Sequence, residues 1–474
     1  MRNRKRVKNP IISALEITAY ANEGKAIGRD DGKAIFVVGA MPGDVVDVRV
    51  TKSKKDFAEG SILNLIKPSP NRIEPRCKHF DYCGGCKWQH VSYAEQLQFK
   101  EALIKDTLKR LGDVEVKEWL PIKGSDNVFF YRNKLEFGFS NKAWVPINAI
   151  ADVERQNTPA LGYHLPGFWD KVFPVEECHL QPEPSESIRK NVYRFCIDHN
   201  FSFFNERKKV GLMRNLMIRV MRTGEVLVLV AFGENDTEKI GLLMEFIAGP
   251  TFPDITSLNY VVNTKVNDTV HDLPVVCFKG REVVYETLGD LKFRISPQSF
   301  FQTNTSQAEA LYNIVKDFAQ LKGNELVYDL YTGTGSIALF LAKHCRHIVG
   351  IEYVPQAIAD AHENKNINNI TNADFHVADI AHAITNADFI KANGKPDVVI
   401  TDPPRAGMHP DVVKSLLTLL PEKIVYVSCN PATQARDLQM MSEQYDVVKG
   451  CPVDMFPHTH HLENVALLVR KAVV

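Results

Sequence analysis

From Pro297 to the C-terminus, short apolar strands alternate with helical segments, and this alternation constrains the fold more than any other feature. Five segments rich in Val and Ile follow one another: ELVYDLY, HIVGIEY, ADFHVAD, PDVVITD and KIVYVSC. Strands that alternate with helices form a parallel sheet with helices on both faces. The sequence therefore predicts a doubly wound, Rossmann-like α/β domain over residues 296–474.

The chain of 474 residues is too long for one hydrophobic core, so we expect further domains ahead of this one. Residues 1–68 show short strands and turns, and Asp31-Gly32 is a hairpin pattern. This predicts a small OB-like β-barrel. Residues 69–295 are rich in strands and irregular, which predicts a mixed, β-rich central domain and an α/β multidomain protein.

One long helix is predicted within the central region, over residues 93–112. Its apolar positions are Leu97, Ala102, Leu103 and Leu108, and a glycine ends it. We expect this helix to pack on the C-terminal domain.

Charge is unevenly distributed although 57 Lys and Arg balance 57 Asp and Glu. Residues 1–76 hold 15 basic and 9 acidic residues, a net charge of +6, which leaves 42 against 48 for the rest. A basic N-terminal module favours a polyanionic partner, although a solvated charged face with a disordered tail explains the same excess. No apolar segment approaches ~18 residues, and no apolar run follows the basic N-terminus, so we expect a cytoplasmic protein.

The first strand of the α/β domain leads into a glycine-bearing turn, ELVYDLYTGTGSIAL. Gly333 and Gly335 allow the backbone to approach a ligand closely, and Glu352 at the end of the next strand suits a ribose diol. The pattern lacks the third glycine of a dinucleotide fingerprint, so S-adenosylmethionine (SAM) fits better than NAD. Asp379 ends the following strand and supports the same site.

The fourth and fifth strands end in Asp402-Pro403-Pro404-Arg405 and in Cys429. The carboxyl ends of parallel strands meet at one edge of a sheet, where ligands bind, so we expect Cys429 to face the cofactor cleft. A buried structural cysteine is the alternative. A free thiol is only partly ionised at neutral pH, yet it remains a strong nucleophile.

Methylation of a pyrimidine at carbon 5 is a reaction that needs a cysteine. Carbon 5 is a weak nucleophile until a thiolate adds to carbon 6, and a base must afterwards remove the carbon 5 proton. Glu463, before the last apolar strand, is the candidate base. Three histidines close by, His458, His460 and His461, have an irregular spacing for a metal site, so we expect a surface turn.

Six motifs together resemble the RNA uracil-5-methyltransferases: FFQTN, DLYTGTGS, GIE, TDPPRAG, SCNPAT and FPHTHHLENV, collinear within residues 300–465. The N-terminal barrel resembles the TRAM domain of that family, an RNA-binding module. The resemblance implies that Cys429 is the nucleophile and Glu463 the general base. It also implies a set of residues that bind SAM or line the site: Gln302, Tyr331, Gly333, Glu352, Asp379 and Asp402.

Four further cysteines form a second pattern, Cys77-x5-Cys83-x2-Cys86 with Cys178. Four thiolates hold zinc or an iron–sulfur cluster, and the five-residue gap is longer than that of zinc hairpins. The pattern resembles that of the family's ribosomal-RNA members, which carry a 4Fe–4S cluster. The family's tRNA-specific members are expected to lack both cluster and TRAM domain. The C-x3-C-x2-C spacing of radical SAM enzymes is absent.

These inferences lead to one prediction, a SAM-dependent enzyme that methylates carbon 5 of a uridine in 23S rRNA through a covalent Cys429 adduct. We expect it to be a monomer with no protein partner and no membrane. Alternatives are another RNA such as tRNA, a non-catalytic iron–sulfur RNA-binding protein, and an amino-group methyltransferase in which Cys429 is incidental. In YRNKLEFGF, Arg132 and Lys134 are candidates for phosphate contacts, and Tyr131 or Phe137 for stacking on a flipped base.

Overall fold

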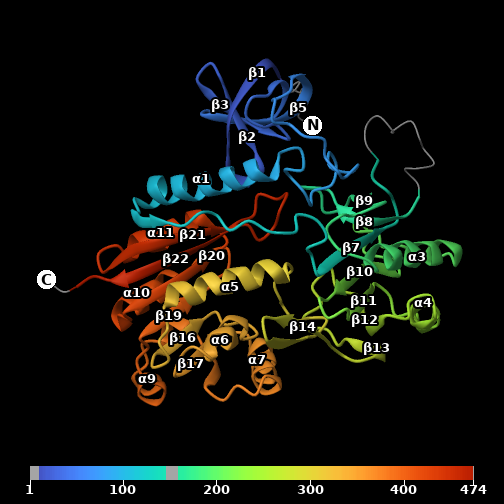
Figure 1. Ribbon diagram of the computed structural model, residues 1–474. Helices are drawn as coiled ribbons and strands as arrows, with labels where there is room; N and C mark the ends of the chain where they lie inside the picture. Colours follow the sequence, from blue (N-terminus) through green and yellow to red (C-terminus); the bar gives the residue numbers. More distant parts are fainter. Residues whose placement is uncertain (1–9, 146–157, 473–474) are drawn as a thin grey trace, which may run out of the picture.

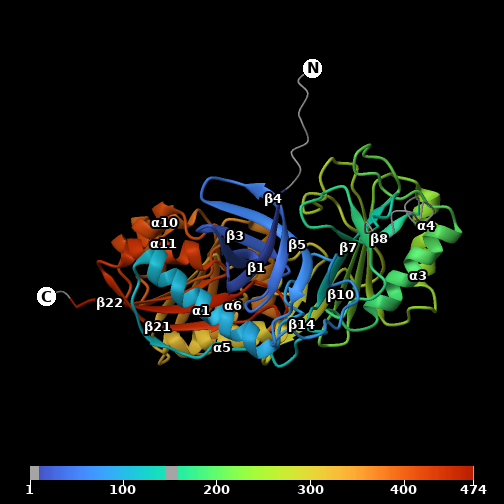
Figure 2. The ribbon, with the colours of Figure 1, turned by 90° about the horizontal axis from the view of Figure 1, so that it is seen from above.

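The computed structural model describes residues 10–145 and 158–472 and contains a closed barrel, two large sheets and a two-stranded hairpin. The barrel lies above helix α1 (Tyr93–Gly112), and the two large sheets lie side by side below it (Figure 1). Seen from above, the barrel is positioned between the two sheets (Figure 2). In the described ranges, no helix is long and apolar enough to cross a membrane.

The N-terminal barrel closes in the order β1-β2-β3-β5-β4 around a small aliphatic core. Its strands are β1 (Ile11–Tyr20), β2 (Ala26–Asp30), β3 (Lys33–Val38), β4 (Val45–Ser53) and β5 (Phe57–Lys67). The predicted hairpin is confirmed: Asp31 and Gly32 join β2 to β3 with φ of 45° and 78°, the left-handed conformation of such tight turns.

The charge excess of the N-terminal region does not come from the barrel. Residues 10–67 hold 8 basic and 8 acidic residues, whereas residues 1–9 hold 5 basic residues and no acidic one. The expectation of a basic barrel is therefore wrong, because the excess positive charge lies in residues 1–9 and 68–76, on either side of the barrel strands.

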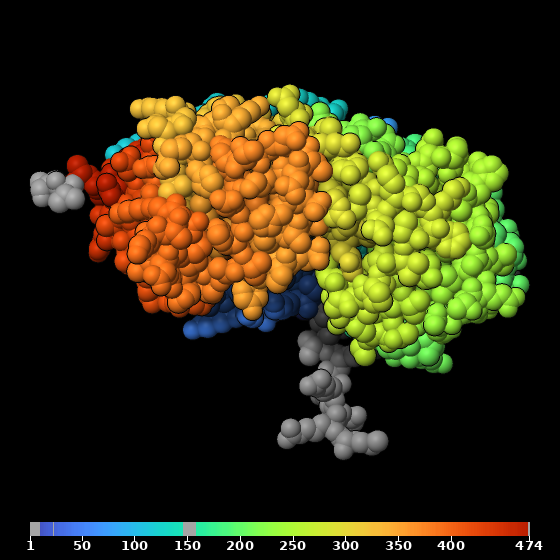
Figure 3. Space-filling model, turned by 90° about the horizontal axis from the view of Figure 1, so that it is seen from below, coloured from blue at the N-terminus to red at the C-terminus, as the bar shows by residue number. Residues whose placement is uncertain are grey.

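The central sheet has seven strands in the order β13-β12-β11-β10-β7-β8-β9. They are β7 (Lys134–Ser140), β8 (Ala160–His164), β9 (Val172–Pro174), β10 (Met213–Val220), β11 (Val226–Phe232), β12 (Ile255–Val262) and β13 (Val276–Gly280). Helices α3 (Ser185–Asp198) and α4 (Thr237–Ala248) cover one face. The other face, with Met217 and Leu229, packs into the core that the C-terminal domain shares, and Figure 3 shows the two parts in contact along a common border.

The second large sheet has eight strands in the order β18-β17-β16-β19-β20-β22-β21-β6. Its strands are β16 (Leu326–Leu330), β17 (His347–Glu352), β18 (Ala373–Val377), β19 (Val398–Thr401), β20 (Lys423–Ser428), β21 (Tyr445–Val453), β22 (Glu463–Arg470) and β6 (Val116–Trp119). The five predicted strands are the five parallel ones, β16 to β20. The predicted doubly wound domain is thus confirmed, with an antiparallel extension by β22 and β21.

Helices cover both faces of this sheet. One core contains α5 (Thr305–Ala319), α6 (Ser336–Ala342) and α7 (Pro355–Ile367). The opposite core contains α8 (Ile380–Ala383), α10 (Pro410–Leu419) and α11 (Pro431–Met441), with α9 (Ala387–Asn393) at its margin. Helix α1 packs against α11, and β6 pairs with β21. A stretch that precedes the central sheet in the chain therefore completes the C-terminal sheet.

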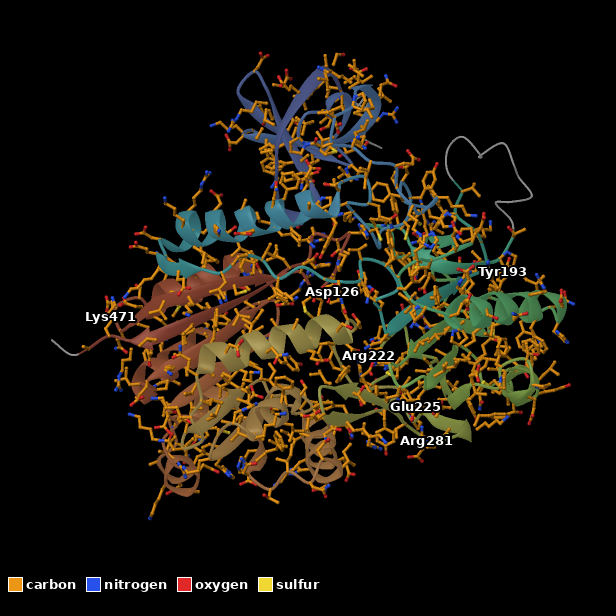
Figure 4. All side chains as sticks on the ribbon, in the orientation of Figure 1. Asp126, Tyr193, Arg222, Glu225, Arg281 and Lys471 are labelled. Atoms are coloured by element: carbon orange, nitrogen blue, oxygen red, sulfur yellow. The ribbon has the colours of Figure 1, made fainter. Side chains whose placement is uncertain are left out.

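Polar contacts fasten the central sheet to α5 and to the hairpin of β14 (Val284–Leu288) and β15 (Leu291–Ile295), where the Tyr285 amide donates to Glu225 at 2.7 Å. Arg222, after β10, pairs with Glu309 of α5 at 2.9 Å, and Arg281 pairs with Glu225 at 2.7 Å. Figure 4 shows Arg222, Glu225 and Arg281 grouped at this junction.

Candidate active site

The turn from β16 into α6 is shaped for a ligand. Three residues in it have left-handed backbone conformations, Tyr331 at φ 61°, Gly333 at 54° and Gly335 at 78°. A Cβ on Gly335 would meet the Phe375 ring at 2.9 Å, so packing demands glycine there. A Cβ on Gly333 would meet nothing within 4 Å. The backbone at Gly333 therefore borders open space, which leaves it accessible to a ligand.

Two carboxylates support this turn. Glu352, at the end of β17, accepts hydrogen bonds from the Gly333 amide at 3.2 Å and from the Tyr353 amide at 2.8 Å. Asp329, at the end of β16, is buried and accepts from the Thr332 hydroxyl, while its Oδ1 has no partner among the described residues. Burial and the nearby Asp402 raise the pKa of Asp329 to about 7. An orphaned buried oxygen in this position fits a polar ligand group.

Of the other predicted cofactor residues, Asp379 and Tyr331 follow strands of the same sheet, whereas Gln302 lies before α5. Asp379 is exposed after β18 and accepts from the His382 amide at 2.9 Å. Burial and the nearby Asp379 and Glu352 contribute to the raised pKa of the Tyr331 hydroxyl, about 12. Gln302 is half-buried just before α5, and its carbonyl accepts from Asn133 at 2.9 Å. Among the described residues, no side-chain hydrogen bond links Gln302 to the turn.

Cys429 and Glu463 lie opposite each other. Ser428, the last residue of β20, pairs with Asn464 of the antiparallel β22. Cys429 follows Ser428 and Glu463 precedes Asn464, so the antiparallel register places Cys429 across from Glu463. Glu463 is buried, and its Oε2 has no partner among the described residues. The sequence placed both residues at strand ends, and only the antiparallel pairing brings them together.

The electrostatics of this pair favour uncharged forms in the free protein. Burial raises the pKa of the Cys429 thiol to about 11, helped by Glu463 and Asp402, while a hydrogen bond from Arg405 acts against the rise. Burial and Asp402 raise the pKa of Glu463 well above its usual range, and burial raises that of Asp402 to about 7. Perturbed groups that cluster in a cleft are typical of catalytic sites.

Cys429 opens into a cavity of about 330 Å³ whose walls come from three parts of the chain. Glu23 comes from the barrel, Leu103 and Thr107 from α1, and Arg405 and His461 from loops of the C-terminal domain. Arg405 contacts the His461 ring, and Asn430 caps α11 while it donates to the Arg405 carbonyl at 3.0 Å. The thiol thus immediately precedes a helix N-terminus, which favours its ionised form.

The histidine-rich turn is not a surface turn. His458 is buried, with its ring stacked on Phe129 at 4.4 Å and its Nδ1 3.1 Å from Nε2 of Gln96, and His460 and His461 are half-buried. Burial is the main cause that lowers the pKa of His458 and His460 to about 4 and that of His461 to about 3. The expectation failed because the partners of this turn are α1 and the barrel, far away in sequence.

Sequence reasoning also missed the polar contacts of α1. Gln96 and Lys100 are fully buried, and Lys100 forms an ion pair with buried Asp454 at 2.6 Å. Of the predicted apolar positions, Leu108 is buried, whereas Ala102 is exposed. The sequence pattern of the helix did not predict the burial of Gln96 and Lys100, because a Lys and a Gln on a helix normally face solvent.

Residues of YRNKLEFGF are placed differently from one another. Phe137 is buried and stacks on Tyr163 at 5.1 Å, so its suggested stacking on a base is wrong. Tyr131 is buried and donates to the Pro457 carbonyl at 3.0 Å, which ties it to the histidine-rich turn. Arg132 lies over the Phe456 ring at 5.2 Å.

The four early cysteines share one small cavity of about 100 Å³. Cys77, Cys83, Cys86 and Cys178 all line it. Over the described ranges, no three His, Cys, Asp or Glu side chains are close enough to hold a single metal ion. A 4Fe–4S cluster makes a different demand, because each thiolate binds a different iron and the four sulfurs surround the cluster. A shared cavity between four thiols fits that arrangement. All nine cysteines of the chain are free.

Comparisons with known proteins agree with this architecture. The profile of the tRNA (Uracil-5-)-methyltransferase family matches residues 279–471, and that of the TRAM domain matches residues 14–63. An uncharacterized RNA methyltransferase of Porphyromonas gingivalis is 50% identical over 96% of this chain and 99% of its own length. One of Bacillus cereus is 36% identical over 97% of both chains.

A solved structure is similar over nearly the whole chain. It is the tRNA (uracil-54, C5)-methyltransferase of Pyrococcus abyssi in complex with S-adenosyl-L-homocysteine, with a TM-score of 0.73, 30% identity, and coverage of 96% of this chain and 100% of that one. Only about 19 residues of this chain stay unmatched, so the match includes much of the barrel. The expectation that tRNA-specific members lack the TRAM region is therefore wrong. This chain belongs to the family of SAM-dependent RNA uracil-5-methyltransferases that carry an N-terminal TRAM domain.

Proposed function

We propose that the protein methylates carbon 5 of a uridine in 23S rRNA, and that Cys429 bonds covalently to carbon 6 during the reaction. The observation that supports the covalent route is the pairing of Ser428 with Asn464, which sets Cys429 across from the buried Glu463. An enzyme that methylates an amino group has no use for a thiol facing a buried carboxylate. A protein that only binds RNA needs neither group.

The proposed reaction uses the two groups in sequence. The thiolate of Cys429 adds to carbon 6, and the electrons of the 5,6 double bond move to the carbonyl at carbon 4. Carbon 5 then takes the methyl group that SAM supplies. Glu463 accepts the carbon 5 proton, the double bond re-forms, and the sulfur leaves as a thiolate. Glu463 performs this step as its carboxylate, and the raised pKa makes that carboxylate a stronger proton acceptor, because a weaker acid has a stronger conjugate base.

We propose that SAM binds beside the glycine turn. Glu352 is placed for the ribose, and the open space at Gly333 allows the ligand to approach the backbone. The remaining proposed contacts are Tyr331, Asp379 and Asp402, which follow strands of this sheet, and Gln302, which lies before α5. Asp402 would then lie between the cofactor and the Cys429–Glu463 pair, since it acts on the pKa of both.

We also propose that Cys77, Cys83, Cys86 and Cys178 hold a 4Fe–4S cluster. Their shared cavity supports it, as does the resemblance of their spacing to that of the family's ribosomal members. Because the cavity shares no lining residue with that of Cys429, we assign the cluster a structural role and no step of the reaction.

The proposed rRNA substrate rests on that cysteine pattern, and tRNA is the competing substrate, since the Pyrococcus abyssi relative acts on tRNA uracil-54. Two experiments test the proposal. Release of tritium from RNA labelled at carbon 5 of uridine must accompany methylation, because only this reaction breaks that C–H bond. Mass spectrometry of rRNA and tRNA fragments from a deletion strain must show one 5-methyluridine missing from 23S rRNA. If 5-methyluridine is missing from tRNA instead, then tRNA is the substrate.

A further inference from the structure

A second large cavity, of about 500 Å³, lies between the central sheet and the segment 297–303. It shares no lining residue with the cavity of Cys429. Its floor is one face of β7, β10 and β11, formed by Lys134, Glu136, Asn215, Met217, Arg219, Leu229 and Ala231. The volume lies in the range of small-molecule sites, so it accommodates a nucleotide.

Arg219 gives this cavity its chemical character. The side chain is 2% exposed, and its Nη2 donates to the Ser299 carbonyl at 2.7 Å. Its Nε and Nη1 have no hydrogen-bond partner in the part of the chain that the structure describes. Glu136, the acid that acts on it, is already paired with Lys134 at 3.5 Å. Nε and Nη1 of Arg219 are also inaccessible to solvent, so an anion in the cavity reaches them only when the Arg219 side chain shifts toward it, and their burial without a partner is costly until then.

A neighbour on the same strand shows what a completed site looks like. Arg214 is equally buried, but its Nε and Nη2 both donate to Asp268, at 3.1 and 2.9 Å. Its Nη1 donates to the carbonyls of Asn263 and Lys265. The fold therefore satisfies one buried arginine of β10 with its own groups and leaves the other incomplete.

Lys134 adds a second cation beside Arg219. The two residues face each other across the β7–β10 ladder and both line the cavity. Burial lowers the pKa of Lys134, and the neighbouring Arg219 lowers it further. Lys134 is partly exposed whereas Arg219 is buried; two adjacent cations repel each other, and an anion between them removes that repulsion. The free Nε–H and Nη1–H lie on different edges of the guanidinium, so an anion here accepts one hydrogen bond from Arg219 and another from the Lys134 ammonium.

We propose that this cavity binds a phosphate group of the RNA substrate, at a nucleotide other than the uridine that reacts, with Arg219 and Lys134 as its ligands. The inference rests on the proposed reaction with RNA and adds a positioning site to it. RNA brings one phosphate for every nucleotide, and a site away from the thiol fixes the register of the strand. The carboxylate of SAM is the competing anion, since the segment 297–303 contains Gln302.

The test compares Arg219→Gln and Arg219→Met with Arg222→Gln. The last variant makes the same change of charge on a half-exposed side chain that is paired with Glu309. We measure binding of a 23S rRNA transcript at several salt concentrations, binding of SAM, and thermal unfolding. Loss of a charge-assisted phosphate contact should weaken RNA binding roughly tenfold or more. It should reduce the salt slope by about 0.7. Affinity for SAM and the melting temperature should not fall, and Arg222→Gln should resemble the wild type.

Three results would overturn the inference. Wild-type RNA affinity and salt slope in both Arg219 variants would exclude a phosphate contact. Weaker SAM binding with unchanged RNA binding would assign the cavity to the SAM carboxylate. A fall in melting temperature in both Arg219 variants, with an unchanged salt slope, would make Arg219 a structural residue. Failure of the wild type to bind and methylate the transcript would count against the proposed substrate instead, which keeps the two failures distinct.

Discussion

The chain has two sites built from thiols, and their surroundings differ. Cys429 is a single thiol opposite a buried carboxylate, with Asp402 and Arg405 close enough to act on its pKa. The four cysteines of the other site line a cavity together with apolar and aromatic side chains and with Arg132 and Glu177, and the Tyr163 hydroxyl lies 3.6 Å from the Cys178 sulfur. At the first site, ionisable groups surround a single sulfur. At the second site, four sulfurs surround one cavity.

This difference indicates that the neighbours of a thiol decide its chemistry. A lone thiol becomes a catalyst when a proton acceptor and a cation are placed beside it. Several thiols around one space become ligands. The barrel touches both regions, because a Cβ on Gly24 would meet Trp88, next to the cysteine segment, at 3.5 Å and His460, next to Cys429, at 3.2 Å. The two sites therefore share a structural support, while the tasks that we propose for them differ.

The largest effect should follow removal of the single thiol. Cys429→Ala should lower methylation on the order of 10⁴-fold or more, because no adduct forms at carbon 6. Tritium release from RNA labelled at carbon 5 measures this loss. Cys277→Ala, which removes a thiol outside both sites, should keep the wild-type rate. Appreciable turnover by Cys429→Ala would contradict the proposal that Cys429 is the nucleophile.

Glu463→Gln should produce a smaller loss of turnover, about 10²–10⁴-fold, with a distinctive signature. The amide does not accept the carbon 5 proton, so the methylated adduct should persist as an RNase-sensitive shifted band on a denaturing gel. Cys429→Ala in the same background should abolish the band. Normal turnover by Glu463→Gln would assign the proton to another group, with Asp402 and His460 as the next candidates.

Loss of one ligand from the four-thiol site should act on stability and metal content. Cys86→Ser should eliminate most of the iron, which we expect at about four per chain in anaerobically purified protein. It should also lower the melting temperature, because binding of a structural metal contributes to folding. Iron analysis and thermal unfolding measure both effects, with Cys277→Ser as control. Stoichiometric zinc without iron in the wild type would contradict the cluster assignment.

The pH dependence of Cys429 should give the smallest effect, about tenfold for each pH unit. With its pKa at about 11, the free thiol is mostly protonated at neutral pH, so the thiolate fraction rises with pH up to that value. The rate of alkylation of Cys429 by iodoacetamide, followed by peptide mass spectrometry, should rise accordingly from pH 7 to 9. Arg405→Gln should react more slowly, because it lacks the positive charge that lowers this pKa. A plateau below pH 8 would contradict the raised pKa.

Local patterns in the sequence determined much of the molecule. The alternation of strands and helices specified the five parallel strands, and Asp31-Gly32 specified a hairpin, because both depend on neighbours in the chain. The placement of Cys429 at a strand end followed from the same alternation, since carboxyl ends of parallel strands meet at one edge. The family motifs then suggested which residues act there.

Only the tertiary structure decided which distant groups meet. The antiparallel pairing of β20 with β22 set Cys429 opposite Glu463, and the docking of α1 buried Gln96 and Lys100 against the loop before β22. The incomplete coordination of Arg219, beside the completed Arg214, is likewise invisible in the sequence. Periodicity reports which face of a segment is apolar, but the burial of a polar side chain depends on a partner that packing of remote segments supplies.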